Sequence, residues 1–101
     1  MKLLPLLAFV HTMRWTFRDL WIQFFELTDG VKKGNFDRLE ELHHLSSGFK
    51  SLCTQRTMEG LMLIRQCIGG AGYTAWSGIP AIITDFSSAV TYEGDNTVMA
   101  Q

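Results

Sequence analysis

Between Leu3 and Leu27 the chain repeats apolar residues at alternating spacings of three and four. This spacing aligns their side chains along one stripe of an α-helix. The stripe consists of Leu3, Leu6, Val10, Met13, Phe17, Leu20, Phe24 and Leu27. We therefore predict one long helix over residues 3–28, roughly 39 Å in length at 1.5 Å per residue. Gly30 is predicted to end this helix, because glycine adopts the left-handed C-terminal conformation at little cost.

Four further large side chains make this stripe wider than the seam between two helices requires. They are Trp15, Trp21, Ile22 and Phe25. A helix with such a wide apolar surface is expected to be covered by neighbouring helices on more than one side. The pattern therefore favours a helical bundle.

A second helical pattern extends over residues 37–68. Its apolar positions are Leu39, Leu42, Leu45, Phe49, Leu52, Met58, Leu61, Met62 and Cys67. Asn35 or Asp37 is placed to cap its start. Gly48 and Gly60 lie in its interior, where each glycine costs about 1 kcal/mol relative to alanine. We expect the close approach of another helix to explain both glycines.

Residues 69–96 have the composition of a turn region. Gly69-Gly70-Ala71-Gly72-Tyr73 and Gly78-Ile79-Pro80 are typical of turns. Pro80 is suited to open a short helix over residues 81–86, because proline fits the first turn of a helix. The fold class predicted for residues 1–101 is all-α, with two long antiparallel helices followed by this Gly/Pro-rich turn region.

A last helix is predicted to begin near Thr97, with Asp95 or Asn96 as its cap. The chain reaches only Gln101, so this helix is represented by a single turn. We interpret the chain as a fragment of one helical domain.

Composition narrows the possible partners. Hydrophobic residues make up 47% of the chain and the net charge is -1, which is a globular composition without a positive field for nucleic acid. Arg14, Arg18 and Asp19 interrupt the apolar run before the roughly 20 residues that a membrane span requires. We therefore predict neither nucleic-acid binding nor a membrane span.

The cysteines and histidines do not have the spacing of a metal site. Cys53 and Cys67 form no CxxC motif. His43 and His44 are adjacent, so they point about 100° apart on a helix and cannot chelate one ion as an i, i+4 pair can. We predict no metal ligand and no disulfide framework.

Two motifs remain ambiguous when they are judged by their residues alone. Gly69, Gly70 and Gly72 follow a helix instead of a strand, so they lack the context of a dinucleotide-binding loop and are more typical of a helix terminator. The Tyr92-Glu93-Gly94 turn places an acidic residue ahead of a helix, where a cap or a solvated charge is commoner than a catalytic base. Neither motif decides the function alone.

Together and in order, these motifs resemble one family. Arg65-Gln66-Cys67-Ile68-Gly69-Gly70-Ala71-Gly72-Tyr73, Ser77-Gly78-Ile79-Pro80 and Thr91-Tyr92-Glu93-Gly94-Asp95-Asn96-Thr97-Val98 are similar to the C-terminal helical region of peroxisomal acyl-CoA oxidases. The resemblance extends back through Gly48-Phe49-Lys50-Ser51-Leu52 to Leu4-Pro5-Leu6-Leu7-Ala8. Acyl-CoA dehydrogenases share the glycines and Tyr-Glu-Gly but typically continue with Thr-Ser-Gln. Asp95-Asn96-Thr97 therefore favours the oxidases, and the resemblance implies part of a C-terminal four-helix bundle.

The resemblance also implies a reaction. Such enzymes use FAD and O2 to convert fatty acyl-CoA to trans-2-enoyl-CoA, with release of H2O2. Glu93 matches the family's catalytic base, and Gly94 would let the substrate approach this base closely. FAD contacts are implied for Gln66, Gly69, Gly70, Asp95, Asn96 and Thr97, while Arg65 is left open between a phosphate contact and pairing on the helix surface. A peroxisomal location and a homodimeric full-length parent follow from the family alone.

Two alternatives stay open. An acyl-CoA dehydrogenase would share the base and flavin but pass electrons to an electron-transfer flavoprotein. A non-enzymatic helical module would use the apolar stripes to bind a partner. For an oxidase fragment, we expect the isolated chain neither to bind FAD tightly nor to turn over acyl-CoA.

Overall fold

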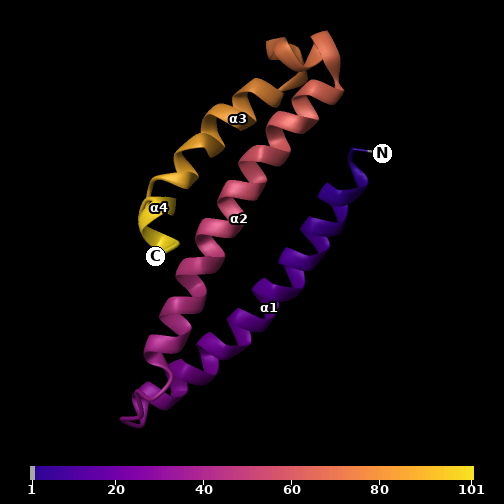
Figure 1. Cartoon of the computed structure of the whole chain (residues 1–101). Coiled ribbons are helices and arrows are strands. Elements are labelled where there is room, and N and C mark those ends of the chain that lie inside the picture. The colour runs from indigo at the N-terminus through magenta and orange to yellow at the C-terminus, as the bar shows by residue number, and fades with distance from the viewer. Residues whose placement is uncertain (1) are drawn as a thin grey trace.

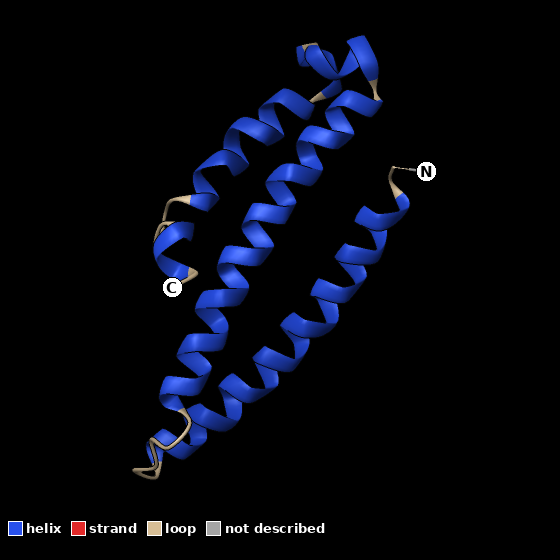
Figure 2. Ribbon diagram, viewed as in Figure 1, coloured by secondary structure: helices blue, strands red, loops and turns tan. Residues whose placement is uncertain are grey.

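The computed structural model describes residues 2–101, which form helices and turns without a strand (Figure 2). Two long helices come first, α1 (Leu4–Lys32) and α2 (Leu39–Cys67). The 3₁₀ turns η1 (Gly69–Tyr73) and η2 (Ala75–Ser77) follow, and then α3 (Ile79–Ser87), η3 (Ser88–Val90) and α4 (Asn96–Met99). The prediction of an all-α fold with two long helices and a turn region is confirmed.

The long helix α2 forms the centre of an elongated molecule that measures 57 × 25 × 23 Å. Helix α1 packs against it in the antiparallel sense, and α3 and α4 return along another side of α2 (Figure 1). The 3₁₀ turns η1 and η2 sit at the end of α2 where the chain reverses, and η3 lies between α3 and α4. Every other helix therefore depends on α2 for its position.

The connection from α1 to α2 differs from the prediction. Gly30 does not end α1, because the helix continues to Lys32 and Gly34 takes the left-handed conformation with a φ of 82°. The Asn35 N–H donates to the Gly30 carbonyl at 3.0 Å, and the Gly34 N–H donates to the Val31 carbonyl at 2.9 Å. This pair of bonds is a Schellman motif. The predicted end was wrong because the later glycine, about one turn on, closes the turn.

Helix α2 also begins differently from the prediction. Its N-cap position is Arg38, and no side chain of the described residues caps it. The Asn35 side-chain oxygen instead accepts the backbone N–H of Asp37 at 2.9 Å. The prediction that Asn35 or Asp37 caps α2 is wrong, because Asn35 serves the turn and Asp37 lies one residue before the cap. Glu40 and Glu41 occupy the first turn, where the helix dipole favours acidic side chains.

The two interior glycines of α2 have different surroundings. Gly60 is buried, and a Cβ added there would lie 3.1 Å from Cδ2 of Leu6 in α1. Within residues 2–101, nothing lies within 4 Å of a Cβ added to Gly48. Close helix packing is therefore confirmed as the reason for Gly60 and is wrong for Gly48 in this chain.

The turn region follows the predicted use of glycine and proline. Gly69 follows α2 with a φ of 67°, and Gly78 precedes α3 with a φ of 70°. Pro80 lies in the first turn of α3, where its missing N–H leaves no helical bond unmade. The predicted short helix is confirmed and extends one residue or more beyond residues 81–86 at each end.

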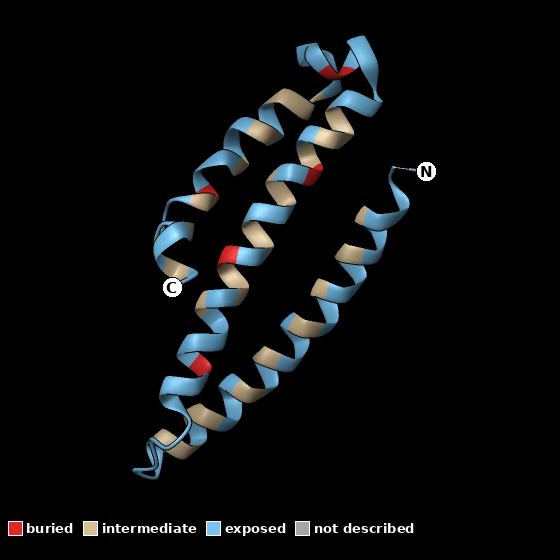
Figure 3. Ribbon diagram, viewed as in Figure 1, coloured by how far each residue is buried: buried red, intermediate tan, exposed pale blue. Residues whose placement is uncertain are grey.

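Very little of the chain is fully buried (Figure 3). The buried apolar side chains are Leu42 and Ala89, and α1 contains no fully buried residue. The four residues that widen the α1 stripe, Trp15, Trp21, Ile22 and Phe25, are all about half exposed or more. The expected covering of α1 on more than one side is thus not provided by this chain. Among residues 2–101, no helix combines the length and apolarity needed to span a bilayer.

Candidate active site

The loop that joins η3 to α4 carries Glu93 in an unusual backbone conformation. Glu93 has a φ of 56° and Gly94 has a φ of 107°, so two consecutive residues lie at positive φ. Glu93 is the single non-glycine residue at positive φ in residues 2–101. A left-handed conformation costs a non-glycine residue about 1 kcal/mol or more and persists where surrounding contacts hold it. The turn is therefore a defined structure that the rest of the chain maintains.

Gly94 is favoured by its positive φ, and the side chain of Met99 packs closely beside it. A Cβ added to Gly94 would lie 2.6 Å from Sδ of Met99 in α4. No larger residue fits there without displacing Met99. The packing of α4 is therefore one reason for a glycine at this position, and the approach of substrate to Glu93 beside Gly94 stays a prediction.

The loop is anchored to the middle of α2 through Asn96. The Ser51 hydroxyl donates to the Asn96 backbone carbonyl at 3.0 Å. The Asn96 side-chain Nδ2 lies 2.9 Å from the Thr54 hydroxyl and 3.3 Å from the Ser51 carbonyl. Both ends of the Asn96 amide group are engaged, because its Oδ1 accepts a bond from Lys50 at 2.9 Å. Asn96 thus ties the start of α4 to α2.

Lys50 makes the remaining contact between α2 and the loop. Its Nζ donates to the Gly94 carbonyl at 2.6 Å in addition to Asn96 Oδ1. These contacts are partly buried, which strengthens a hydrogen bond from a charged donor. One ammonium group therefore holds two residues of the loop.

Asp95 caps α4 and is one of the two candidate caps that the sequence predicts, the other being Asn96. Its carboxylate accepts the Thr97 N–H at 2.8 Å, and the helix begins at Asn96. The bond from the Thr97 backbone N–H, with a further contribution from the Thr97 side chain, lowers the pKa of the Asp95 carboxyl below its ordinary value. The carboxylate form therefore belongs to the folded cap.

The Glu93 side chain is exposed, and within residues 2–101 it makes neither a hydrogen bond nor a salt bridge. The Tyr92 N–H just before it donates to the Ser88 carbonyl at 3.0 Å, whereas the Glu93 N–H has no protein acceptor among the described residues. The turn thus presents a carboxylate and a free backbone donor from the same residue. That combination suits the removal of a proton beside a carbonyl whose oxygen needs a hydrogen-bond donor.

The predicted FAD contacts fall into two separate groups. Asp95, Asn96 and Thr97 lie beside Glu93, whereas Gln66, Gly69 and Gly70 lie at the end of α2. From Thr54, which contacts the loop, to Gln66 the helix rises roughly 18 Å at 1.5 Å per residue. The structure does not bring the two groups into contact, so a single ligand that touched both would have to be extended along α2.

The glycine end of α2 leaves backbone open to a ligand. Added Cβ atoms at Gly69 and Gly70 would meet nothing within 4 Å. Gly72 differs, because a Cβ there would overlap the carbonyl oxygen of Arg65. The Nε of Arg65 is buried and has no hydrogen-bond partner among residues 2–101. The open backbone at Gly69 and Gly70 is of the kind that can approach a phosphate closely, whereas the unpaired Arg65 Nε lies inside the chain.

Sequence reasoning missed Lys50, Ser51 and Thr54 as residues that hold the site. Lys50 and Ser51 are adjacent on α2 and Thr54 lies about one turn further on, and their polar side chains interrupt its apolar pattern. That interruption was the available signal, but it does not reveal which distant segment the side chains meet. No group of three or more possible metal ligands gathers in the part of the chain that the structure describes.

Comparison with known proteins identifies the family. The family model described as "Acyl-CoA oxidase, C-alpha1 domain" matches residues 1–101. The chain belongs to this acyl-CoA oxidase domain family. Its relatives include peroxisomal acyl-coenzyme A oxidase 1 of Rattus norvegicus, 37% identical over 98 residues that cover 97% of this chain and 15% of that protein.

Other acyl-CoA oxidases are similar over the same extent. Peroxisomal acyl-coenzyme A oxidase 2 of Mus musculus is 37% identical over 99 residues, and oxidase 1 of Homo sapiens is 34% identical over 98 residues. These matches cover 97% of this chain but only 14% and 15% of the two relatives. The resemblance to acyl-CoA oxidases is thus confirmed, and the acyl-CoA oxidase domain described here corresponds to a small part of those enzymes.

Proposed function

We propose that the chain is the segment of an FAD-dependent acyl-CoA oxidase that supplies the catalytic base, Glu93. We call the full-length oxidase that contains this segment the parent enzyme. The parent enzyme converts fatty acyl-CoA to trans-2-enoyl-CoA and reduces O2 to H2O2. As the names of the relatives suggest, it acts in the peroxisome, and by resemblance to the family it is a homodimer.

One observation carries the proposal. An acyl-CoA oxidase domain places an exposed carboxylate without a protein partner on a turn of positive φ, and contacts from α2 hold that turn. A carboxylate that served only as a helix cap would accept a bond from the helix that follows. Asp95 makes that bond instead of Glu93, so Glu93 remains available for substrate.

The proposed reaction requires two groups from the Glu93 turn, a proton acceptor and a hydrogen-bond donor. The α-proton of a thioester is too weakly acidic for an ordinary carboxylate unless the developing charge on the thioester oxygen is stabilised. The free N–H of Glu93 supplies one donor for that oxygen, and the Glu93 carboxylate accepts the proton. Gly94 adds no side chain of its own beside these two groups, and the side chain of Met99 occupies the space that a Cβ would take. A single turn thus provides the base and part of the oxyanion stabilisation.

FAD, when bound, supplies the acceptor for the hydride that leaves the substrate's β-carbon. Gly69 and Gly70 would hold its diphosphate through open backbone, with Gln66 and Arg65 beside them. Asp95 and Thr97 are exposed near Glu93 and would provide further contacts to FAD. Asn96 contributes by fixing the turn, since its side chain is already bound to α2.

The test is a Glu93→Gln variant of the parent enzyme. Glutamine keeps the size of the side chain but cannot accept the proton, so we expect H2O2 release to fall by about 10²- to 10⁴-fold. Glu40→Gln, in the exposed first turn of α2, is the matched control and should retain the parent rate. Undiminished H2O2 release by Glu93→Gln would contradict the assignment.

The same assay separates the alternatives. A dehydrogenase would reduce an electron-transfer flavoprotein and release little H2O2, while a binding module would keep its activity in Glu93→Gln. The isolated 101-residue chain is expected to lack tight FAD binding, because the open glycine backbone and one cationic side chain provide only part of a dinucleotide site. Flavin absorbance that remained with the purified chain would refute this expectation.

A further inference from the structure

The Glu93 turn is held on both sides by hydrogen bonds. Before it, the Tyr92 N–H donates to the Ser88 carbonyl at 3.0 Å. After it, the Gly94 carbonyl accepts the Lys50 ammonium at 2.6 Å. Glu93 lies between these two anchors, so its direction depends on both.

Lys50 is committed to the loop by its surroundings. Its ammonium is partly buried, and no carboxylate of residues 2–101 pairs with it. Two of its three N–H donors are used by Gly94 and by Asn96 Oδ1. Withdrawing a lysine from water toward neutral acceptors is unfavourable unless those bonds are well formed. A surface lysine with only a solubility role would not be arranged in this way.

The position of the Lys50 contact matters because of the peptide geometry. Gly94 has a φ of 107°, and many values of its ψ are open to a glycine. A bond to the Gly94 carbonyl removes that freedom at the residue directly after Glu93. Asp95 and Asn96, which follow, are fixed by the α4 cap and by α2. Without the bond from Lys50, the ψ angle of Gly94 would be the least constrained backbone angle between Glu93 and α4.

We propose that Lys50 is a positioning residue for the reaction, which fixes the direction of the Glu93 carboxylate through the Gly94 carbonyl. The inference rests on the proposed role of Glu93 as the base. Lys50 does not touch the reacting atoms and moves no proton. Its contribution is geometric, and misplacement of a catalytic group by about 1 Å can cost roughly 100-fold in rate.

The experiment compares lysine variants of the parent enzyme loaded with FAD. Lys50→Met keeps the aliphatic length but removes all three donors, and we expect kcat to fall about 10- to 100-fold with a smaller change in KM. Proton removal should then limit turnover, so α-deuterated acyl-CoA should show a larger isotope effect on kcat than in the parent. Lys50→Arg restores a cationic donor and should recover much of kcat. Lys33→Met, at the exposed α1–α2 turn, is the matched control and should leave kcat and the isotope effect unchanged.

A merely structural role predicts a different result. Lys50→Met would then lower the melting temperature while leaving kcat per bound FAD and the isotope effect as in the parent, and this outcome would overturn the inference. If Lys50→Met does not fold with FAD, Lys50→Gln carries the same test with a shorter, neutral and polar side chain. Failure of the two claims is distinguishable: full turnover by Glu93→Gln refutes the proposed function, whereas loss in Glu93→Gln with full turnover in Lys50→Met refutes the role of Lys50 alone.

Discussion

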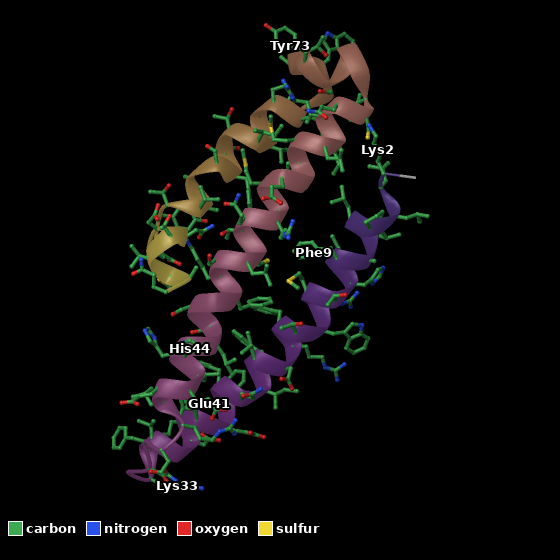
Figure 4. All side chains as sticks on the ribbon, in the orientation of Figure 1. Lys2, Phe9, Lys33, Glu41, His44 and Tyr73 are labelled. Carbon is green, nitrogen blue, oxygen red and sulfur yellow. The ribbon has the colours of Figure 1, made fainter. Side chains whose placement is uncertain are left out.

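The two sides of α2 differ in how their contacts are made. On the side of α3 and α4, polar groups of α2 hold a defined turn through bonds to Gly94 and Asn96. On the side of α1, contacts are mainly apolar and open, apart from the bonds of Arg38 to Gln23 and Glu26 at the start of α2. A groove of about 430 Å³ lies between α1 and α2, lined mainly by Phe17, Leu20, Trp21, Phe24, Leu27, Leu39, Leu42 and Phe49. Figure 4 shows side chains such as Phe9 between the two helices and Tyr73 projecting from the far end.

Directional hydrogen bonds define the conformation on one side of α2, whereas apolar contacts predominate on the other side. Directional bonds give the Glu93 turn one conformation without a large core. The aromatic side chains of α1 instead contact one another. The ring of Trp21 is stacked on that of Phe17, with 5.9 Å between ring centroids, and lies edge-on to that of Phe25, with 5.2 Å between centroids. All three remain about half exposed. The order of the turn should therefore be less dependent on α1 than on α2.

The largest effect on stability is expected when a buried side chain between α1 and α2 is shortened. Leu42 is 8% exposed and lines the contact of α2 with α1. Leu42→Ala should lower the free energy of unfolding of the chain by about 2 to 4 kcal/mol, measured by urea denaturation. Hydrogen exchange should show lost protection in α1 and little change in α3. Leu52→Ala is the control, because Leu52 is 49% exposed. Equal losses of unfolding free energy in the two variants would show that burial of Leu42 between α1 and α2 does not stabilise the chain.

A smaller effect is expected at the turn end of α2. A Cβ on Gly72 would overlap backbone of Arg65, which cannot rotate away as a side chain can. Gly72→Ala should therefore lower the free energy of unfolding by about 1 to 3 kcal/mol. Gly70→Ala should stay within about 0.5 kcal/mol, because nothing lies near its added Cβ. Indistinguishable denaturation curves for the two variants would show that the close approach at Gly72 is not needed.

The smallest effect concerns the exposed α4 cap and its pH dependence. The Thr97 N–H lowers the pKa of the Asp95 carboxyl below its ordinary value of 3.8. Since the folded pKa is depressed, the cap's contribution is fully present above the ordinary value and is lost as pH falls through the lower folded pKa. NMR titration should show a carboxyl midpoint below 3.8. Asp95→Asn should keep the cap and abolish this titration, and a midpoint at or above the ordinary value would exclude the capping bond.

The sequence predicts the parts of this structure that depend on local pattern. Helical spacing locates α1 and α2, proline locates the start of α3, and the cap of α4 is narrowed to Asp95 or Asn96. The end of α1 is misplaced because Gly30 and Gly34 offer similar local signals, and only the hydrogen bond from Asn35 distinguishes them. Sequence alone also cannot pair Lys50 with Gly94, since 44 residues separate them and only the return of α3 along α2 brings them together.

In the candidate site, too, some features follow from the sequence and others are visible only in the structure. Glu93 is found from the resemblance to acyl-CoA oxidases, and its unusual φ is visible only in the structure. Asn96 is expected beside FAD because of its place in the motif, yet its amide group is occupied by α2. A motif identifies which residues matter, whereas the contacts show what holds each one.

The most direct measurement is the rate of flavin reduction after anaerobic mixing of the parent enzyme with acyl-CoA. Without O2, this rate reports the removal of the two substrate hydrogens and excludes product release and reoxidation. We expect Glu93→Gln to bind acyl-CoA but to leave the flavin oxidised on the timescale in which the parent enzyme is fully reduced. Flavin reduction at the parent rate in this variant would contradict the role of Glu93 as the base.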